Sequence, residues 1–144
     1  MNRKGKCQAQ NIALSLQRLL VALALTSGMA VAQGQSQAVG NWSGRFSSHN
    51  FASFPVSLAI TQDVRGNLHA RATIVHPCIK NSTLIVTIVG NNIVLGGSDS
   101  DGDTITFRGD IDPAGTLLNL SFVLNGSPSG RCETDQGQGS MAKQ

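Results

Sequence analysis

The sequence predicts an all-β protein, a small antiparallel up-and-down β-barrel of about eight strands, preceded by a signal peptide. Three observations support this fold class. Larger apolar residues alternate with polar or small ones along several short segments, which is typical of half-buried strands. Turn-forming residues separate these segments at short intervals. No segment after the N-terminal leader shows the periodicity of a helix.

Residues 1–32 have the organisation of a secretory signal peptide. An apolar run over 19–25 and the small residues Ala30-Val31-Ala32 follow a basic start made by Arg3, Lys4, Lys6 and Arg18. The apolar run is much shorter than the ~20 residues that a membrane-spanning helix needs, and no later segment comes closer. We therefore expect cleavage near Ala32, no membrane span, and a secreted or periplasmic location.

Residues 33–144 are predicted to form a single β-barrel domain. Its first three strands are expected over 42–46, 54–61 and 68–74. In the second of these, Phe54, Val56, Leu58 and Ile60 occupy every second position and would share one face. Segment 68–74 repeats the alternation, so each of these strands should have one solvated face.

The later strands are expected over 83–89, 93–95, 104–108, 118–124 and 131–135. Segments 83–89 and 93–95 are more continuously apolar and β-branched, so we expect both of their faces to be covered. Segments 104–108 and 118–124 return to strict alternation.

The connections between these segments are short and rich in Gly, Asn, Asp and Pro. Connections of this length join neighbouring strands antiparallel, because a parallel crossover needs a dozen residues or more. About eight strands is the number at which a sheet can close into a barrel and remove its exposed edges. The alternative is a two-sheet β-sandwich.

Cysteine usage agrees with export. Cys7 lies in the leader, which leaves Cys78 and Cys132 as an even pair for a disulfide. In a sandwich this disulfide would bridge the two sheets. The rival interpretation treats His76 and Cys78 as part of a metal site, but no second pair of ligands matches them. We predict a structural disulfide, no metal site and no cofactor.

The charge of the predicted mature chain gives no sign of nucleic-acid binding. Four of the 11 Lys and Arg residues lie in the leader, which leaves seven against eight Asp and Glu. The remaining basic residues are scattered singly and form no footprint for a phosphate backbone.

The segment Gly40-Asn41-Trp42 resembles the G-x-W motif of calycins, the superfamily of lipocalins, fatty-acid-binding proteins and avidins. The resemblance implies that Trp42 closes one end of the barrel and that a basic side chain near the last strand packs over it. Arg131 stands at a comparable place in the chain. The chain has one Trp and no Tyr, so the aromatic box with which avidins bind biotin is missing. Alternatively, Trp42 is the largest core residue of an unrelated β-protein.

No residue pattern predicts catalysis, and we expect the protein not to be an enzyme. The candidate bases are His49, His69 and His76, and none lies in a recognisable catalytic motif. Each is predicted to face solvent. The acidic segment 99–103 resembles the start of a calcium loop, but Thr104 occupies the position where such a loop needs Gly, so we expect an acidic hairpin turn.

Two functional classes are compatible with a small exported barrel, which we expect to be a monomer. The favoured one is a binding protein that acts through its loops on a protein partner, as barrel-shaped inhibitors do, with 45–53 and 126–131 as the contact loops. The alternative is a lipocalin-like carrier of a small apolar ligand in the barrel mouth. The residues that would line or fill the interior are Val56, Leu58, Ile60, Leu120 and Phe122.

Overall fold

The computed structural model describes residues 35–128 and 132–144. The predicted signal peptide, residues 1–32, and Arg131 lie outside the described residues. Within the described part of the chain, no helix has the length and apolar character needed to cross a membrane.

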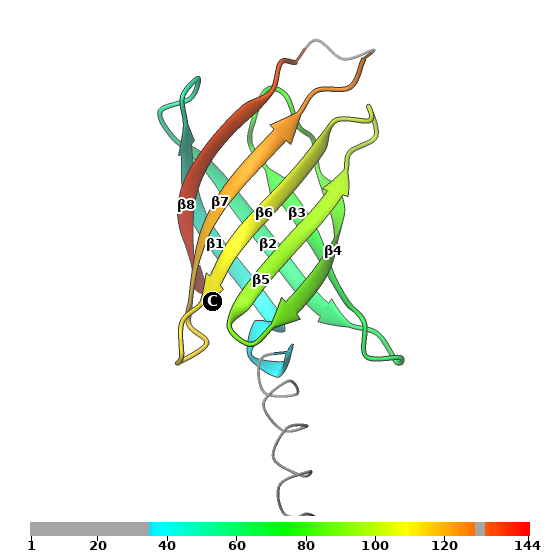
Figure 1. Ribbon diagram of the computed structural model, residues 1–144, viewed down its shortest axis with the longest axis vertical. Coiled ribbons are helices and arrows are strands. Elements are labelled where there is room, and N and C mark those ends of the chain that lie inside the picture. Colours follow the sequence, from blue (N-terminus) through cyan, green and yellow to red (C-terminus); the bar gives the residue numbers. More distant parts are fainter. Residues whose placement is uncertain (1–34, 129–131) are drawn as a thin grey trace, which may run out of the picture.

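Eight antiparallel strands form a closed barrel in chain order (Figure 1). Each strand pairs with the next, and β1 also pairs with β8, so the described sheet has no free edge. The predicted fold class is confirmed, and the sandwich alternative is wrong. The strands are β1 (Gly40–Ser48), β2 (Phe54–Gln62), β3 (Leu68–Ile74), β4 (Ser82–Val89), β5 (Asn92–Ser98), β6 (Thr104–Ile111), β7 (Leu117–Asn125) and β8 (Asp135–Lys143).

The last strand lies later in the chain than predicted. Within the predicted segment 131–135, residues 132–134 form no strand, and β8 begins only at Asp135. Two inward positions of β8 are Gly137 and Gly139 rather than large apolar residues. A Cβ at Gly139 would lie 2.6 Å from the Phe46 ring, and one at Gly137 would lie 2.8 Å from the Phe122 ring. Glycine is therefore required there, and β8 lacks the apolar alternation by which the other strands were recognised.

Side chains fill the barrel interior. The five residues predicted to point inward, Val56, Leu58, Ile60, Leu120 and Phe122, are all buried. Four phenylalanines pack together inside the barrel, with ring centroids 5.4 to 6.2 Å apart: Phe46, Phe54, Phe107 and Phe122. Most of these rings meet edge to face, an arrangement that stabilises aromatic clusters.

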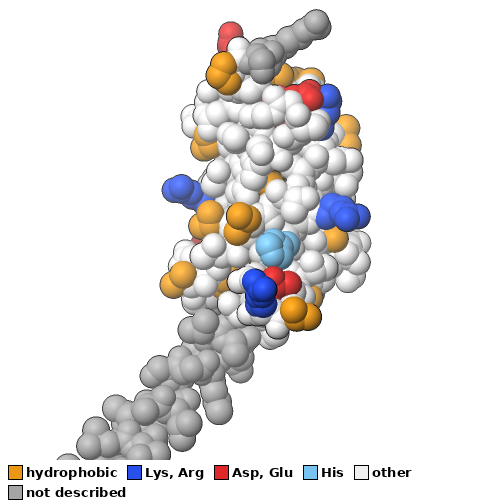
Figure 2. Space-filling model, turned by 90° about the vertical axis from the view of Figure 1, so that its right-hand side faces the viewer, with side chains coloured by type: hydrophobic (Ala, Val, Ile, Leu, Met, Phe, Trp, Pro, Cys, Tyr) orange, Lys and Arg blue, Asp and Glu red, His pale blue; other side chains and the backbone are white. Residues whose placement is uncertain are grey.

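The outer face of β4 and β5 is not covered, contrary to the prediction for these strands. Ile85, Val89 and Val94 point outward and are exposed to solvent. Their inward neighbours, such as Leu84 and Ile93, are buried, so these strands alternate in burial like the others although the sequence is apolar on both faces. Exposed hydrophobic side chains are scattered singly over the face shown in Figure 2, among mostly uncharged polar surface.

The barrel has two differently built ends, which we call the Trp42 end and the disulfide end. The Trp42 end comprises a helical turn over 35–38, the start of β1, the end of β8 and three tight turns between strands. The disulfide end comprises the loops 49–53, 75–81 and 99–103 and the described residues 126–128 and 132–134 between β7 and β8.

Candidate functional site

A disulfide joins two loops of the disulfide end, as the sequence predicts. Cys78 and Cys132 are bonded, with their Cα atoms 5.4 Å apart and a sequence separation of 54. Cys78 lies in the loop between β3 and β4, and Cys132 lies in the loop between β7 and β8. The disulfide thus joins loops that four strands separate along the chain.

His76 is buried, and the prediction that it faces solvent is wrong. Its side chain is 0% exposed, and its ring meets those of Phe51 and Phe54 edge to face at centroid distances of 4.4 and 4.9 Å. The inward positions of β3 are its even-numbered residues from Leu68 to Ile74, and His76 continues this alternation one step beyond the strand. That alternation was the available signal that the ring points inward.

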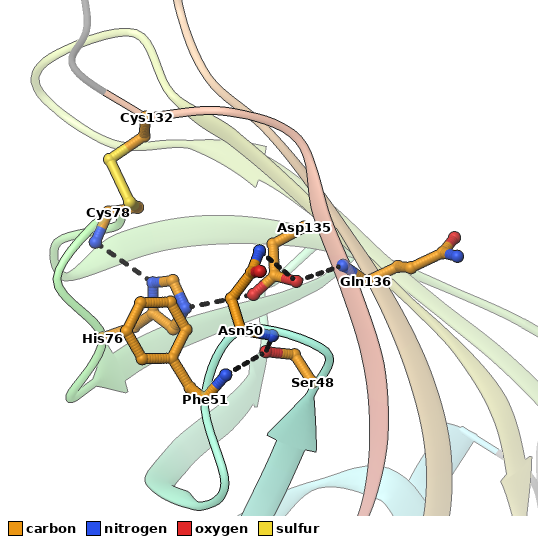
Figure 3. Close-up of polar contacts among 8 residues, drawn as sticks. All are labelled: Ser48, Asn50, Phe51, His76, Cys78, Cys132, Asp135 and Gln136. Atoms are coloured by element: carbon orange, nitrogen blue, oxygen red, sulfur yellow. Dashed lines mark hydrogen bonds and ion pairs between the residues drawn. A yellow bond between two sulfur atoms is a disulfide. The ribbon is translucent and has the colours of Figure 1, made fainter.

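Asp135, the first residue of β8, faces His76 inside the disulfide end (Figure 3). Its Oδ2 lies 3.5 Å from His76 Nε2, and its side chain is 5% exposed. Its Oδ1 accepts hydrogen bonds from Asn50 Nδ2 at 3.2 Å and from the backbone N–H of Gln136 at 2.9 Å. Within the described residues, Nε2 and Oδ2 are the buried side-chain atoms that lack a hydrogen-bond partner. Each is directed at the other across a gap slightly too long for a good hydrogen bond.

The contact of the other ring nitrogen, Nδ1, decides which nitrogen of the neutral His76 ring carries the proton. The backbone N–H of Cys78 donates to His76 Nδ1 at 3.1 Å, so Nδ1 must carry a lone pair. The neutral ring then carries its proton on Nε2, where it points toward Asp135. Burial lowers the pKa of His76 below its ordinary value, and the Asp135 carboxylate opposes that shift only in part. The site therefore favours a neutral imidazole.

Loop 49–53 closes over this pair. Ser48 Oγ accepts hydrogen bonds from the backbone N–H groups of Asn50 and Phe51 at 3.2 and 3.0 Å, which shapes the start of the loop. Asn50 then bonds to Asp135, and Phe51 packs on His76. The buried pair therefore holds the loop through Asp135 of β8 and through His76 of the β3–β4 loop.

A groove of about 690 Å³ lies beside this loop on the outer face of the barrel. It crosses β1, β8, β7 and β6. Ala52 and Ser53 bring loop 49–53 to its border, and Arg45 Nε donates a hydrogen bond to Ser53 Oγ at 2.8 Å. The outward-pointing residues that line the groove are Arg45, Ser47, Arg108, Asn119, Ser121, Gln138 and Ser140.

The charged side chains that line the groove are positive; Asp110, exposed on β6, lies outside the lining, in register with Asn119. Arg45 and Arg108 line the groove, whereas no Asp or Glu does. Among the described residues, neither arginine forms an ion pair with a carboxylate. Each guanidinium therefore presents N–H donors in the planar fork that binds carboxylates in a bidentate manner.

The acidic segment 99–103 forms a hairpin turn that holds other loops of the disulfide end. Asp99 Oδ1 accepts the backbone N–H groups of Asp101 and Asp103, while its Oδ2 accepts that of Lys80. Lys80 Nζ lies 2.6 Å from Asp101 Oδ2, and this contact lowers the pKa of Asp101. The buried Asp103 accepts the backbone N–H of Ser127 at 2.6 Å. These carboxylates are engaged in organising the loops.

At the Trp42 end, Trp42 is 1% exposed and closes the barrel. Its Nε1 donates to the backbone oxygen of Ala38 at 2.8 Å, in the helical turn that precedes β1. The cation over the indole in the described structure is Lys143, whose Nζ lies 5.3 Å from the ring centroid and donates to the backbone oxygen of Gln37. Lys143 is the last residue of β8; Arg131, the basic residue that the calycin resemblance implied over the Trp, lies outside the described residues.

Comparison with known proteins shows the fold and no closer relationship. No protein-family model matches the sequence, and no curated protein matches it either. The structure of EF1p2_mFAP2b bound to DFHBI superimposes with a TM-score of 0.59 at 11% sequence identity, over 80% of this chain and 98% of that one. The structure of a redesigned β-barrel gives a TM-score of 0.58 at 10% identity, over 77% of this chain and 95% of that one. The chain therefore has the fold of small closed β-barrels.

Proposed function

We propose that the chain is an exported binding protein, and not an enzyme, which recognises an acidic segment of a protein partner in the arginine-lined groove. The observation that carries this proposal is the pair Arg45 and Arg108, which lies among hydroxyl and amide side chains without a carboxylate partner among the described residues. The Cys78–Cys132 disulfide supports a secreted or periplasmic location, since disulfides persist in oxidising compartments.

The architecture favours recognition by outer side chains. Every strand of the barrel is paired on both sides, so a partner cannot add a strand to an edge. The interior is occupied by the phenylalanine cluster and its aliphatic neighbours. The outer groove and the loop at its border remain as the concave surface that offers directed polar groups.

The positions of the two arginines indicate the form of the partner. Arg45 lies on β1 and Arg108 on β6, with β8 and β7 between them. Three strand spacings and an offset of two residues place them roughly 15 Å apart along the sheet. An extended chain covers that distance in about four residues. We expect the partner to present two carboxylates at this spacing, with its backbone contacting the Asn, Gln and Ser side chains between them.

Reversing charge in the groove tests the proposal. The immobilised protein is expected to retain a partner from the exported fraction of its source, and Arg45→Glu with Arg108→Glu should abolish retention. Arg71→Glu is the matched control, because Arg71 is exposed on β3, away from the groove. Retention should also weaken at high salt, which screens exposed charges. Equal retention by the double variant and the control would refute the groove as the site.

The alternative function is carriage of a small apolar ligand. It is supported by the likeness to EF1p2_mFAP2b, a barrel of the same fold that is bound to DFHBI. The candidate lining residues remain Val56, Leu58, Ile60, Leu120 and Phe122, which would have to move apart to admit a ligand because they are buried against one another. Native mass spectrometry of the protein purified from its source distinguishes the two functions: a small molecule lost on denaturation favours the carrier, and a bare protein favours the groove.

A further inference from the structure

We propose that the His76–Asp135 pair is an acid-operated latch on loop 49–53, closed while His76 is neutral and released when the ring takes up a second proton. The proposal rests on two buried polar atoms that face each other, His76 Nε2 and Asp135 Oδ2. It rests also on the other ring nitrogen, Nδ1, which accepts a hydrogen bond from the β3–β4 loop. Its consequence for partner binding rests on the proposed function of the groove; the release of the loop does not.

The neutral ring contacts residues of four parts of the barrel: the β3–β4 loop, β8, loop 49–53 and β2. Nδ1 accepts the N–H of Cys78 from the β3–β4 loop, Nε2–H is directed at Asp135 on β8, and the ring faces receive Phe51 and Phe54. Asp135 in turn accepts Asn50 of loop 49–53. The closed arrangement of this loop thus depends on an imidazole that has one donor and one acceptor.

The protonated ring cannot keep the hydrogen bond that its neutral form accepts from Cys78. A proton on Nδ1 would face the N–H of Cys78, and two donors directed at each other repel. The Cys78 backbone or the ring must move to give the new proton an acceptor. Movement of the ring withdraws it from Phe51 of the loop and from Asp135, which bonds to Asn50 of the loop.

Asp135 is the charged group that faces the ring among the described residues. The other contacts of His76 are Phe51, Phe54 and the disulfide-bonded Cys78, none of which titrates. Asp135 favours protonation of the ring, and burial opposes it more strongly, so the pKa of His76 lies below its ordinary value. Uptake of the proton is therefore expected on acidification below neutral pH, where exposed histidines titrate first.

Release of the loop would alter the groove directly. Ala52 and Ser53 form part of its border, and Ser53 Oγ holds Arg45 Nε. Opening of the loop would break this hydrogen bond. The Arg45 side chain could then turn away from the groove. Partner retention should therefore fall as the latch opens.

NMR spectroscopy of the intact protein tests the latch without any partner. As the pH falls from about 7.5 to about 5, the His76 ring resonances should titrate, and hydrogen exchange at the amides of Phe51 and Cys78, corrected for its intrinsic pH dependence, should accelerate with the same midpoint. The single Trp lies at the other end of the barrel, and its indole exchange should not change. Titration of His76 with unchanged loop exchange would overturn the proposal.

Variants separate the latch from general acid sensitivity. His76→Phe places a non-titrating ring between Phe51 and Phe54 and should abolish the acid-induced acceleration. His69→Phe is the matched control, because His69 pairs with Asp63 at 3.7 Å on the exposed surface, and it should retain the acceleration. Asp135→Asn keeps an acceptor for Asn50 but removes the charge, so the midpoint should shift to lower pH; an unchanged midpoint overturns the proposal even where His76→Phe does not fold.

The partner assay distinguishes the latch from the proposed function. If the loop opens in acid but no partner requires Arg45 and Arg108, the groove assignment fails and the latch stands. If a partner requires both arginines and loop exchange does not respond to pH, the groove stands and the latch fails. Agreement between the midpoint of partner release and that of loop opening supports both.

Discussion

At the Trp42 end, the barrel is closed by one large aromatic ring, the helical turn before β1 and a lysine of the last strand, whereas at the disulfide end it is closed by a covalent bond between two loops and by a buried His–Asp pair. Trp42 bonds to Ala38, four residues earlier, and Lys143 covers its ring. The disulfide end combines Cys78 with Cys132 and His76 with Asp135.

The difference concerns the conditions under which each end stays closed. An indole side chain does not titrate, so its packing does not respond to acid. A neutral histidine, by contrast, responds to acid, and a disulfide responds to reductants. We infer that the Trp42 end is the constant part of the barrel and that the disulfide end, which borders the groove, is the responsive part.

The largest loss of stability is expected from Trp42→Ala. Removal of a fully buried indole leaves a cavity and an unpaired carbonyl at Ala38, so the free energy of unfolding should fall by about 3 to 5 kcal/mol. Chemical denaturation followed by circular dichroism measures this loss. Trp42→Phe keeps an aromatic ring, so its free energy of unfolding should fall clearly less than that of Trp42→Ala. Equal losses for the two variants would show that burial of the ring contributes little at this end.

Removal of the disulfide should reduce the free energy of unfolding slightly less than Trp42→Ala does. A bond across 54 residues constrains the unfolded chain by about 4 kcal/mol in the chain-entropy model, and measured values commonly fall to about 2 to 4 kcal/mol. Cys78→Ser with Cys132→Ser should reduce the free energy of unfolding by this amount. Hydrogen exchange should rise around His76 and Asp135 before it rises around Trp42; uniform acceleration along the barrel would contradict the separation of the two ends.

At each end, the sequence indicated the groups that a short motif or a residue count reveals. The G-x-W segment at 40–42 indicated a closing Trp, and the alternation in β2, β3, β6 and β7 indicated their inward faces. The disulfide followed from an even cysteine count. The cation over Trp42 was harder to find, because β8 lacks large residues at Gly137 and Gly139.

The buried pair escaped sequence analysis for a physical reason. His76 is polar and follows the end of its strand, so composition favours exposure although the alternation of β3 points the ring inward. Asp135 gives no such signal, because its burial depends on contacts with Asn50, Gln136 and His76, which lie in three separate segments of the chain. The groove depends on the pairing of β1 with β8, the first and last strands in the chain, whose register the sequence does not reveal.

A smaller effect is expected from acid. The pKa of His76 is lowered in the folded protein, so the unfolded chain binds more protons as the pH falls. The resulting contribution to stability is complete above the ordinary pKa of histidine and is lost as the pH falls through the lower pKa of the folded state. Denaturant titrations at several pH values should show this loss, and His76→Phe should show less of it; an identical pH profile in the variant would assign the acid sensitivity to other groups.

The smallest effects should come from two lysines, one at each end of the barrel, and their order tests the contrast between the ends. Lys143→Met retains most of the side-chain volume over the indole but removes the cation and the hydrogen bond to the Gln37 oxygen, so a loss of about 1 kcal/mol is expected. Lys80→Met is the matched change at the disulfide end, where Lys80 pairs with Asp101 in solvent and should matter less because water screens exposed ion pairs. Denaturant unfolding of both variants decides the order. A larger loss for Lys80→Met would mean that ion pairing among the loops, rather than a cation over the indole, makes the greater contribution to closing this barrel.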